Sequence, residues 1–476
     1  MILVIDIGTS SVRAAVVRPD ATLAVVHQQA LLPSTPFPGL VEIDAAELAA
    51  VALGLARRAL ADAGPVEAVG ITNQRASTIV WDRETGVPVG PGLGWQDLRT
   101  IGECLTLQAE GIRIAPNVSA TKLVNLLAGT DRARPLCFGT IDTWIAWQLS
   151  EGAVHVTDLS NAGLTGLLRT DASGWSEELL DRLDVPTAML PTIVDSTGIV
   201  GHATALDGGP PIAGIAGDQQ ASLVGQSCVQ PGQAKATFGT GGMLDVCLGR
   251  RPAFEVRGEA GCFPIVCWRQ GDDVVWGTEA VMLAAGSNVE WLRDDLGLIA
   301  AAEESDAVAA QCDTTDGVVY VPALLGLGAP HWDHGARGAL LGITRGSARP
   351  QIVRAVLEGI AQRGADLLDA AETDGGAPIA ALRVDGGMSA NATFLQSLAD
   401  ATQRPIEVSP VTEATTLGAA YLAGLAVGTW AGWDDVAAAW RPRTTVEPAG
   451  TLDRERWADA KQRAAEWYPE LSAIDF

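Results

Sequence analysis

The chain is poor in the residues that build metal centres and disulfide frameworks. It has 5 histidines and 7 cysteines among 476 residues, the cysteine count is odd, and no two cysteines form a Cys-x-x-Cys pair. Scattered residues of this kind do not supply a zinc site. We therefore expect reduced, mostly buried thiols, which are typical of a cytoplasmic protein.

Positive charge is also scarce. Lys and Arg number 32 against 57 Asp and Glu, which gives a formal net charge of −25. Nucleic acids and anionic membrane surfaces are bound by basic surfaces, so we expect neither as a partner. No apolar stretch of about 18 residues lacks a charge or a turn residue, so no membrane span is expected. The segment MILVIDIGTS lacks the basic residues of a signal peptide.

Apolar residues and glycine, by contrast, are abundant. Apolar residues make up 47% of the chain, which is enough for hydrophobic cores. A chain of 476 residues exceeds the range of one compact core, so two or three domains are expected. Glycine contributes 53 residues, above its average share of about 7%. The position of these glycines is therefore informative.

Two distant segments share one pattern, in which a turn containing Gly-Thr separates two short apolar runs. The runs cover residues 2–5 and 12–17 around Gly8-Thr9, and residues 234–237 and 243–248 around Gly239-Thr240. Such runs predict β-hairpins. Each hairpin opens a segment in which strands and helices alternate. The sequence therefore predicts an α/β protein with two related domains that meet near residues 226–232.

Helix signals follow each hairpin. Asp44 is a predicted N-cap for a helix over residues 45–63, which ends at Gly64-Pro65. The remaining predicted elements are strands over 66–71 and 382–384, and helices over 351–372, from 391, over 414–427 and over 453–467.

Both Gly-Thr turns favour phosphate binding. Gly8 lets the backbone approach a ligand, and successive backbone N–H groups in such a turn bind anions. Thr240 offers a hydroxyl and an N–H to a γ-phosphate. Asp6, at a strand end, is placed to hold Mg²⁺, and Arg13 adds a positive charge. An ordinary hairpin explains either turn alone, whereas the duplication favours two turns that clamp a phosphate chain.

Three further motifs suit a nucleotide and a hydroxylated substrate. Asp385-Gly386-Gly387 ends a strand before a helix, where Asn391 caps the helix or contacts a base. Asp218-Gln219 follows an apolar strand, where a carboxylate can accept a hydroxyl proton. Arg75 and Trp95 suit a small polyol, which an arginine and an indole ring can bind. The alternatives are a simple helix cap, a solvated loop carboxylate and a core tryptophan.

These motifs resemble the FGGY carbohydrate kinase family, and within it most closely the glycerol kinases. The resemblance extends from Asp6 to about Trp430. The matching stretches are Asn73-Gln74-Arg75, residues 80–86, residues 217–220, residues 326–330, residues 338–343 followed by residues 351–358, and residues 417–428.

The resemblance implies two actin-like, ribonuclease H-like ATPase domains that flank a central cleft. It implies MgATP-dependent phosphorylation of a sugar or polyol hydroxyl. The first domain, residues 1–228, would carry the substrate and the catalytic base; the second, residues 229–440, would bind the nucleotide; a helical tail, residues 441–476, would follow. A homodimer is left open.

The resemblance also assigns individual roles. Asp218 would be the general base and Asp6 would serve the magnesium site. The other positions are Thr9, Ser10, Arg13 and Thr240 for the phosphates, Gly286, Gly387 and Asn391 for the nucleotide, and Arg75, Trp95, Asp218 and Gln219 for the substrate.

Three substrate positions depart from the glycerol kinase pattern. Ala76 replaces a Glu that binds glycerol hydroxyls, Asn117 replaces a Tyr, and Met243 replaces a Phe. Loss of a buried hydroxyl partner changes discrimination between substrates strongly. We therefore expect a substrate that is larger than glycerol or differently hydroxylated.

Three alternatives stay open at this stage. An authentic glycerol kinase with a repacked pocket is the first, and a catalytically inactive polyol-binding member of the family is the second. An actin-like ATPase of the chaperone type is the third, although it would need a peptide-binding domain after about residue 430 and gives no role to Asn73-Gln74-Arg75 or Trp95.

Overall fold

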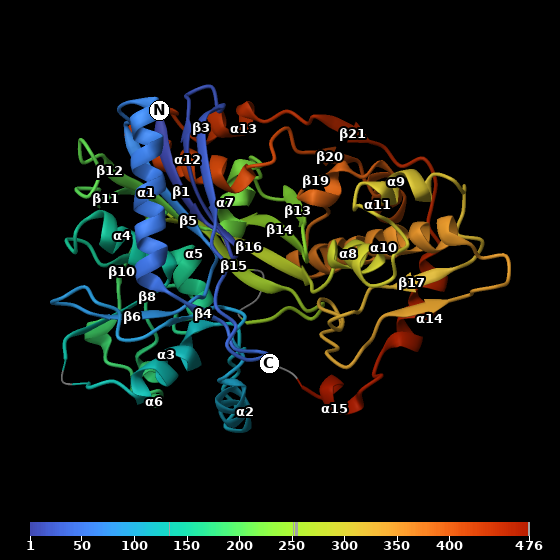
Figure 1. Ribbon diagram of the computed structural model, residues 1–476, viewed down its shortest axis with the longest axis horizontal. Coiled ribbons are helices and arrows are strands. Elements are labelled where there is room, and N and C mark those ends of the chain that lie inside the picture. The colour runs from blue at the N-terminus through green and yellow to red at the C-terminus, as the bar shows by residue number, and fades with distance from the viewer. Residues whose placement is uncertain (133, 251, 253–255, 475–476) are drawn as a thin grey trace.

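Two mixed β-sheets with helices on their faces form the protein (Figure 1). The computed structural model describes residues 1–132, 134–250, 252 and 256–474. In spatial order, the first sheet contains β11 (Thr197–His202), β12 (Pro211–Gly217), β5 (Ala68–Asn73), β1 (Ile2–Ile7), β2 (Ser11–Val17) and β3 (Leu23–Ala30). The second contains β15 (Phe263–Gln270), β16 (Asp273–Met282), β14 (Gly242–Gly249), β13 (Ala234–Phe238), β19 (Leu382–Asp385), β20 (Ile406–Val408) and β21 (Thr444–Val446).

Both predicted hairpins are confirmed. β1 pairs antiparallel with β2 around the first Gly-Thr turn, and β13 pairs antiparallel with β14 around the second. Every residue of β1 is buried, as expected for a short apolar run that is covered on both faces. The duplicated strand–turn–strand pattern is therefore present in three dimensions.

The predicted helix after the first hairpin is α1 (Ala45–Ala63). The Asp44 carboxylate accepts hydrogen bonds from the backbone N–H groups of Ala46 and Glu47, and Gly64 ends the helix with φ 83°. Its buried residues, which include Leu48 and Leu55, cover β2 and β3 on one side of the first sheet (Figure 1). This helix is confirmed at both ends.

Two helices lie where the halves meet. α7 (Asp218–Gly225) and α12 (Ala414–Val427) cross so closely that a Cβ on Gly418 would lie 1.7 Å from the backbone oxygen of Ala221. α12 also packs on β5 and β12, although it comes from the C-terminal half of the chain. The first sheet is therefore covered by a helix that comes more than 300 residues after β5 in the sequence.

α10 (Arg349–Gly375) is the long buried helix of the second half, and it packs on α11 and β16. The other helices are α2 (Ile101–Ala109), α3 (Ser119–Ala128), α4 (Ile141–Leu149), α5 (Leu159–Ala162), α6 (Glu177–Arg182), α8 (Ser287–Asp294), α9 (Glu304–Ala309), α11 (Ala392–Thr402), α13 (Trp433–Ala439), α14 (Arg454–Ala464) and α15 (Pro469–Ser472). Short strand pairs are β4 (Glu42–Ile43) with β7 (Gly92–Leu93), β6 (Ile79–Asp82) with β8 (Leu136–Gly139), β9 (Val156–Asp158) with β10 (Thr192–Val194), and β17 (Val319–Val321) with β18 (Ala339–Leu341).

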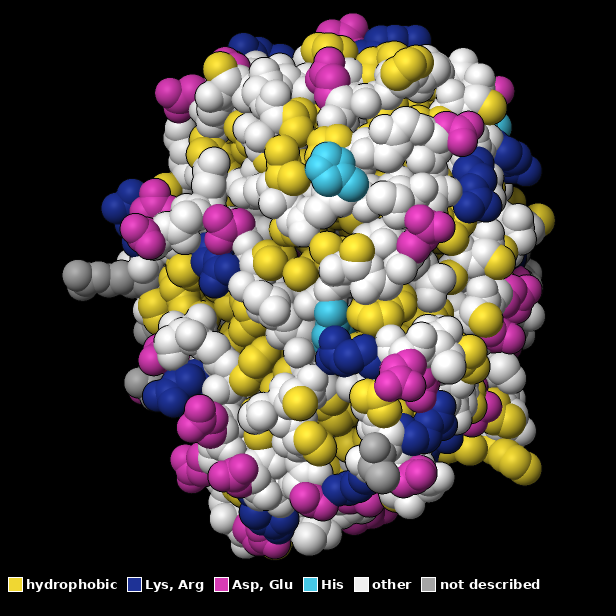
Figure 2. Space-filling model, turned by 90° about the vertical axis from the view of Figure 1, so that its left-hand side faces the viewer, with side chains coloured by type: hydrophobic (Ala, Val, Ile, Leu, Met, Phe, Trp, Pro, Cys, Tyr) yellow, Lys and Arg dark blue, Asp and Glu magenta, His cyan; other side chains and the backbone are white. Residues whose placement is uncertain are grey.

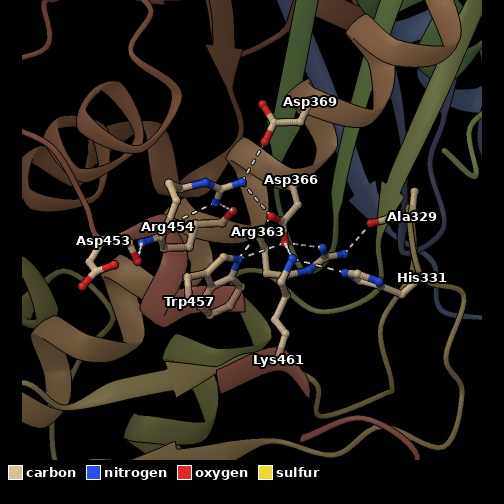
Figure 3. Close-up of polar contacts among 10 residues, drawn as sticks. Ala329, His331, Arg363, Asp366, Asp369, Asp453, Arg454, Trp457 and Lys461 are labelled. Atoms are coloured by element: carbon tan, nitrogen blue, oxygen red, sulfur yellow. Dashed lines mark hydrogen bonds and ion pairs between the residues drawn. The ribbon is translucent and has the colours of Figure 1, made fainter. Parts of the chain in front are cut away.

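The predicted C-terminal helix is α14, and an ionic cluster docks it onto α10 (Figure 3). Asp366 of α10, which is 4% exposed, contacts Arg363 at 2.9 Å, Arg454 at 2.8 Å and Lys461 at 2.9 Å. The indole N–H of Trp457 also donates to this carboxylate. Burial raises the pKa of Asp366, but the three cations outweigh burial and lower it to about 2.

The surface carries both signs of charge. Figure 2 shows Asp and Glu side chains interspersed with Lys and Arg on the side of the molecule that carries the first sheet. No helix among the described residues is long and apolar enough to span a membrane.

Asp366→Asn is expected to destabilise the docked tail by about 3–5 kcal/mol, because it leaves buried cations without their carboxylate. Chemical denaturation measures the loss, and limited proteolysis shows whether the tail is released. Because the pKa of Asp366 is lowered, its contribution is present above about pH 4 and disappears as the pH falls toward 2. The matched control is Asp369→Asn, since Asp369 is 63% exposed and pairs only with Arg454 among the described contacts. Equal losses for both variants would contradict the role of Asp366.

Candidate active site

Three strands of the first sheet end at one level and place the predicted catalytic residues there. In the pairing of β1, β5 and β12, Ile7 lies opposite Asn73, and Asn73 lies opposite Gly217. The residues that follow are the Gly8-Thr9 turn, Gln74-Arg75 and Asp218. Because parallel strands deliver their carboxyl ends to one edge, the motifs from three sequence positions become neighbours.

The second sheet has a matching edge. Thr237 of β13 lies opposite Asp385 of β19, and Gly242 of β14 lies opposite Met282 of β16. The Gly239-Thr240 turn and Gly386-Gly387 therefore leave the sheet side by side. This edge gathers the predicted phosphate and nucleotide motifs.

Polar contacts join the two edges. Arg75 Nη2 lies 2.8 Å from Glu279 Oε2, and Lys235 Nζ donates to Gln219 Oε1 at 2.6 Å. Ser222 Oγ of α7 donates to Asp385 Oδ2 at 3.4 Å. The predicted base and substrate residues thus lie against strands of the second sheet.

Asp218 is the first residue of α7, and its side chain is 28% exposed. Its Oδ1 accepts a hydrogen bond from the backbone N–H of Gln219 at 2.8 Å and lies 3.5 Å from Arg75 Nε. Burial raises the pKa of Asp218, and Arg75 opposes that shift. A partly exposed carboxylate with a raised pKa is suited to accept a proton.

Asp6 lies at the end of β1 and is 7% exposed. Its Oδ2 accepts from Thr416 Oγ1 at 2.9 Å and from Arg13 Nη1 at 3.2 Å, and Arg13 also pairs with Glu413. Burial raises the pKa of Asp6 to about 6. Thr416 and Glu413 belong to the C-terminal half, and nothing in their sequence surroundings marks them as partners of Asp6.

The metal-ligand set is sparse. Among the described residues, no group of three or more His, Cys, Asp or Glu side chains is placed to hold a metal ion. Mg²⁺ commonly takes one or two carboxylates together with water and substrate phosphates. Asp6 fits such a site. At the matching edge of the second sheet, Asp385 Oδ1 is a buried acceptor that finds no hydrogen-bond partner among the described residues.

The predicted phosphate residues are accessible. Ser10 and Thr240 are exposed, and Thr9 is half-buried. Thr9 Oγ1 accepts a hydrogen bond from the indole N–H of Trp95 at 3.3 Å, so Trp95 joins the first phosphate turn to the substrate side. Gly239 has open space where a Cβ would stand, which leaves room for a ligand.

The predicted nucleotide residues divide into two kinds, accessible ones and ones engaged within the protein. Gly387 is exposed, with open space beside it, whereas Gly286 packs against the second turn and donates to the Gly239 oxygen at 2.8 Å. Asn391 Oδ1 caps α11 through the N–H of Phe394, and Asn391 Nδ2 donates to Ser305. Both polar atoms of the Asn391 amide therefore have partners within the protein, which agrees with a helix cap rather than a base contact.

The segments that carry the predicted substrate residues Ala76, Trp95 and Asn117 are held together by buried polar groups. Lys122, which is 0% exposed, donates to the backbone oxygens of Trp95, Pro116 and Val118. Ser119 Oγ donates to the Ala76 oxygen at 3.0 Å. Ala76 itself has φ 62° and Asn117 is exposed. Burial lowers the pKa of Lys122 to about 8.

Met243 comes from the other half. It is half-buried on β14 between Thr237 and Val281. No hydrogen bond or ion pair ties it to Ala76, Trp95 or Asn117 among the described residues. Its place in a pocket with them remains a prediction.

Sequence reasoning missed Lys235, Asp245, Glu279 and Lys122. The first three stand in otherwise apolar strands and are at most 5% exposed. An unpaired charge in a buried strand is costly. A charged residue within an apolar strand therefore indicates a buried ion pair, and this was the signal that the sequence offered. Nothing in the sequence indicated what their partners would be.

Comparisons with known proteins agree with this architecture. Residues 1–225 match the N-terminal domain and residues 234–427 the C-terminal domain of the FGGY family of carbohydrate kinases. The chain is 43% identical to a glycerol kinase of Aromatoleum aromaticum, with 98% of this chain and 99% of the relative covered. It is 44% identical to a glycerol kinase of Trichlorobacter lovleyi, with coverage of 97% and 96%.

The structure is similar to that of a solved kinase. A crystal structure of Plasmodium falciparum glycerol kinase with ADP superposes with a TM-score of 0.90 at 29% identity, and covers 100% of this chain and 99% of that one. This similarity confirms the predicted two-domain α/β fold of the actin-like type.

The pair Gly386 and Gly387 should separate folding from ligand binding. Gly386 has φ 86°, and a Cβ there would lie 2.4 Å from the Phe238 oxygen, so Gly386→Ala should lower the melting temperature markedly. Gly387 has neither constraint, so Gly387→Ala should fold normally and weaken ATP binding. Thermal unfolding and titration calorimetry measure the two effects. Normal ATP affinity in Gly387→Ala would contradict the nucleotide role.

Proposed function

Since the chain belongs to the FGGY family of carbohydrate kinases, we propose that it transfers the terminal phosphoryl group of ATP to a hydroxyl of a small polyol or sugar. The observation that carries this proposal is the position of Asp218. Its partly exposed carboxylate follows β12 at the edge that faces the nucleotide motifs of the second sheet. Residues 1–228 would bind substrate and supply the base, residues 229–440 would bind nucleotide, and residues 441–476 would form the tail.

Asp218 would act as the general base. The Arg75 and Gln219 contacts both end on Oδ1, so Oδ2 is left to accept the proton of the attacking hydroxyl. The raised pKa makes the carboxylate a stronger base than an ordinary aspartate. The substrate hydroxyl would then attack the phosphorus in line with the departing ADP oxygen.

The phosphates would lie between the two Gly-Thr turns. Backbone N–H groups of both turns, the hydroxyls of Thr9, Ser10 and Thr240, and the Arg13 cation would bind them. Mg²⁺, held by Asp6 and the phosphates, would neutralise charge on the transferred group. The ADP in the related Plasmodium structure supports an adenine nucleotide as donor.

The two halves would close on the substrates. Substrate residues come mainly from the first half and nucleotide residues mainly from the second, so approach of the halves would bring the reactants together and exclude water. In the closed state, exclusion of water would prevent it from attacking the terminal phosphate in place of the acceptor hydroxyl.

The substrate is proposed to differ from glycerol. Ala76 supplies no carboxylate, and Asn117 and Met243 supply no aromatic ring, where the glycerol kinase pattern has Glu, Tyr and Phe. An authentic glycerol kinase with a repacked pocket is the second candidate, and the 43% identity to a named glycerol kinase favours it. The presence of Asp6, Asp218 and Thr240 argues against an inactive member.

Asp218→Asn should abolish phosphoryl transfer, because the amide cannot accept the hydroxyl proton. A loss of about 10²–10⁴-fold in kcat is expected from removal of a general base. ATP binding, measured by calorimetry, should change little because Asp218 lies on the substrate side. Near-normal kcat in this variant would refute the assignment of the base.

A panel of polyols and sugars, assayed for ATP-dependent turnover, identifies the acceptor. A polyol or sugar other than glycerol is expected to give the highest kcat/KM. Ala76→Glu restores a hydroxyl acceptor and should raise kcat/KM for glycerol relative to that acceptor by about tenfold or more. Glycerol as clearly the best substrate of the parent would favour the second candidate, and absence of any acceptor would contradict the kinase function.

A further inference from the structure

A row of buried charges crosses the second sheet beneath the proposed base. Lys235 of β13 lies opposite Asp245 of β14, and Asp245 lies opposite Glu279 of β16. Their exposed fractions are 0%, 0% and 5%. We call these three residues the charge row. Cross-strand neighbours at one register point to the same face of a sheet, so the three side chains share one face.

The charge row contacts the residues that hold the base. Lys235 Nζ lies 2.8 Å from Asp245 Oδ2 and donates to Gln219 Oε1 at 2.6 Å. Glu279 Oε2 lies 2.8 Å from Arg75 Nη2. Asp218 Oδ1 is approached by the backbone N–H of Gln219 and by Nε of the Arg75 side chain. Asp218 is therefore flanked by two arms, each anchored on the second sheet.

Stability alone is a weak explanation for this arrangement. Burying ionised groups carries a desolvation cost, and an apolar replacement of a buried ion pair is often neutral or stabilising. Burial raises the pKa of both Asp218 and Asp245, which reflects that cost. A charged row in otherwise apolar strands therefore points to a role in the site that it borders.

We propose that Lys235 and Glu279 are positioning residues, which hold Gln219 and Arg75 and thereby orient the Asp218 carboxylate toward the acceptor hydroxyl. This inference rests on the proposed function and adds a coupling between the halves. The charge row belongs to the sheet that carries the nucleotide motifs, whereas Gln219, Arg75 and Asp218 belong to the substrate half. The orientation of the base thus depends on how the second sheet lies against the first.

The two arms have different chemistry. Glu279 shares the Arg75 guanidinium with Asp218, so loss of the Glu279 charge would let Arg75 shift toward Asp218 and away from a bound hydroxyl. Lys235 fixes the Gln219 side-chain oxygen, so the Gln219 amide nitrogen is left for the substrate. Asp245 pairs with Lys235 and holds its ammonium group in place, but among the described contacts it touches neither Gln219 nor Arg75.

The decisive variant removes charge without leaving an unpaired ion. Lys235→Met with Asp245→Asn replaces the buried pair by neutral groups of similar size, so we expect a folded protein with a melting temperature near that of the parent. Its kcat/KM for the acceptor should fall roughly 100-fold, as a misplaced reacting group does, while its Kd for ATP changes less than about twofold. Glu279→Gln should show the same split between acceptor turnover and ATP binding.

Arg383→Gln is the matched control. Arg383 lies next to Lys235 in the pairing of β13 and β19 and donates to the Gln226 oxygen across the same boundary, but it contacts neither Arg75 nor Gln219. Arg383→Gln should change the melting temperature but not kcat/KM for the acceptor or the Kd for ATP. The positioning role would be overturned if the folded double variant had the same kcat/KM for the acceptor as the parent. It would also be overturned if Arg383→Gln lowered kcat/KM for the acceptor as much as the double variant does.

Hydrogen exchange separates this inference from the proposed function. The backbone amides of residues 217–222 should exchange faster in the double variant than in the parent, because the Gln219 anchor is gone. Unchanged exchange there would overturn the inference even if the kinase function holds. Failure of the kinase function would instead appear in the parent protein, as absence of turnover with every acceptor.

Discussion

The contact between Arg75 and the two carboxylates on either side of it links the halves of this protein. The guanidinium lies 2.8 Å from Glu279 of the second sheet and 3.5 Å from Asp218 of the first half. It is 9% exposed, so these interactions are little screened by solvent. The residue pair that follows β5 and β12 is thereby joined to β16 of the second sheet.

An acidic protein can bind a polyanion because the site does not depend on net charge. Under the proposed function, backbone N–H groups in the two Gly-Thr turns, together with Arg13, would supply the local positive potential. Arg13 is itself held between Asp6 and Glu413. The −25 of the whole chain is spread over the surface, where salt screens it, and does not oppose these short-range contacts.

The sequence was informative about elements whose signals are local. The cap at Asp44, the stop at Gly64 and the glycines between short apolar runs act on neighbouring residues, so α1 and both hairpins were predicted. Asn391 was left open between a cap and a base contact, and the structure shows the cap. The sequence suggested that Met243 and Asn117 both belong to the substrate pocket. The fold places them on different halves, and no polar contact among the described residues joins them.

The family membership, the base candidate and the phosphate turns were thus determined by the sequence, because each rests on residues adjacent in the chain. Only the tertiary structure decided which buried charges meet. Asp6 pairs with Thr416 and Arg75 with Glu279 across hundreds of residues, and α12 packs on a sheet whose first strand begins at residue 2. A charged residue in an apolar strand indicates, from the sequence alone, that a partner is needed, because an unpaired buried charge is costly. Which residue becomes that partner depends on strand register and helix packing, and these depend on the whole chain.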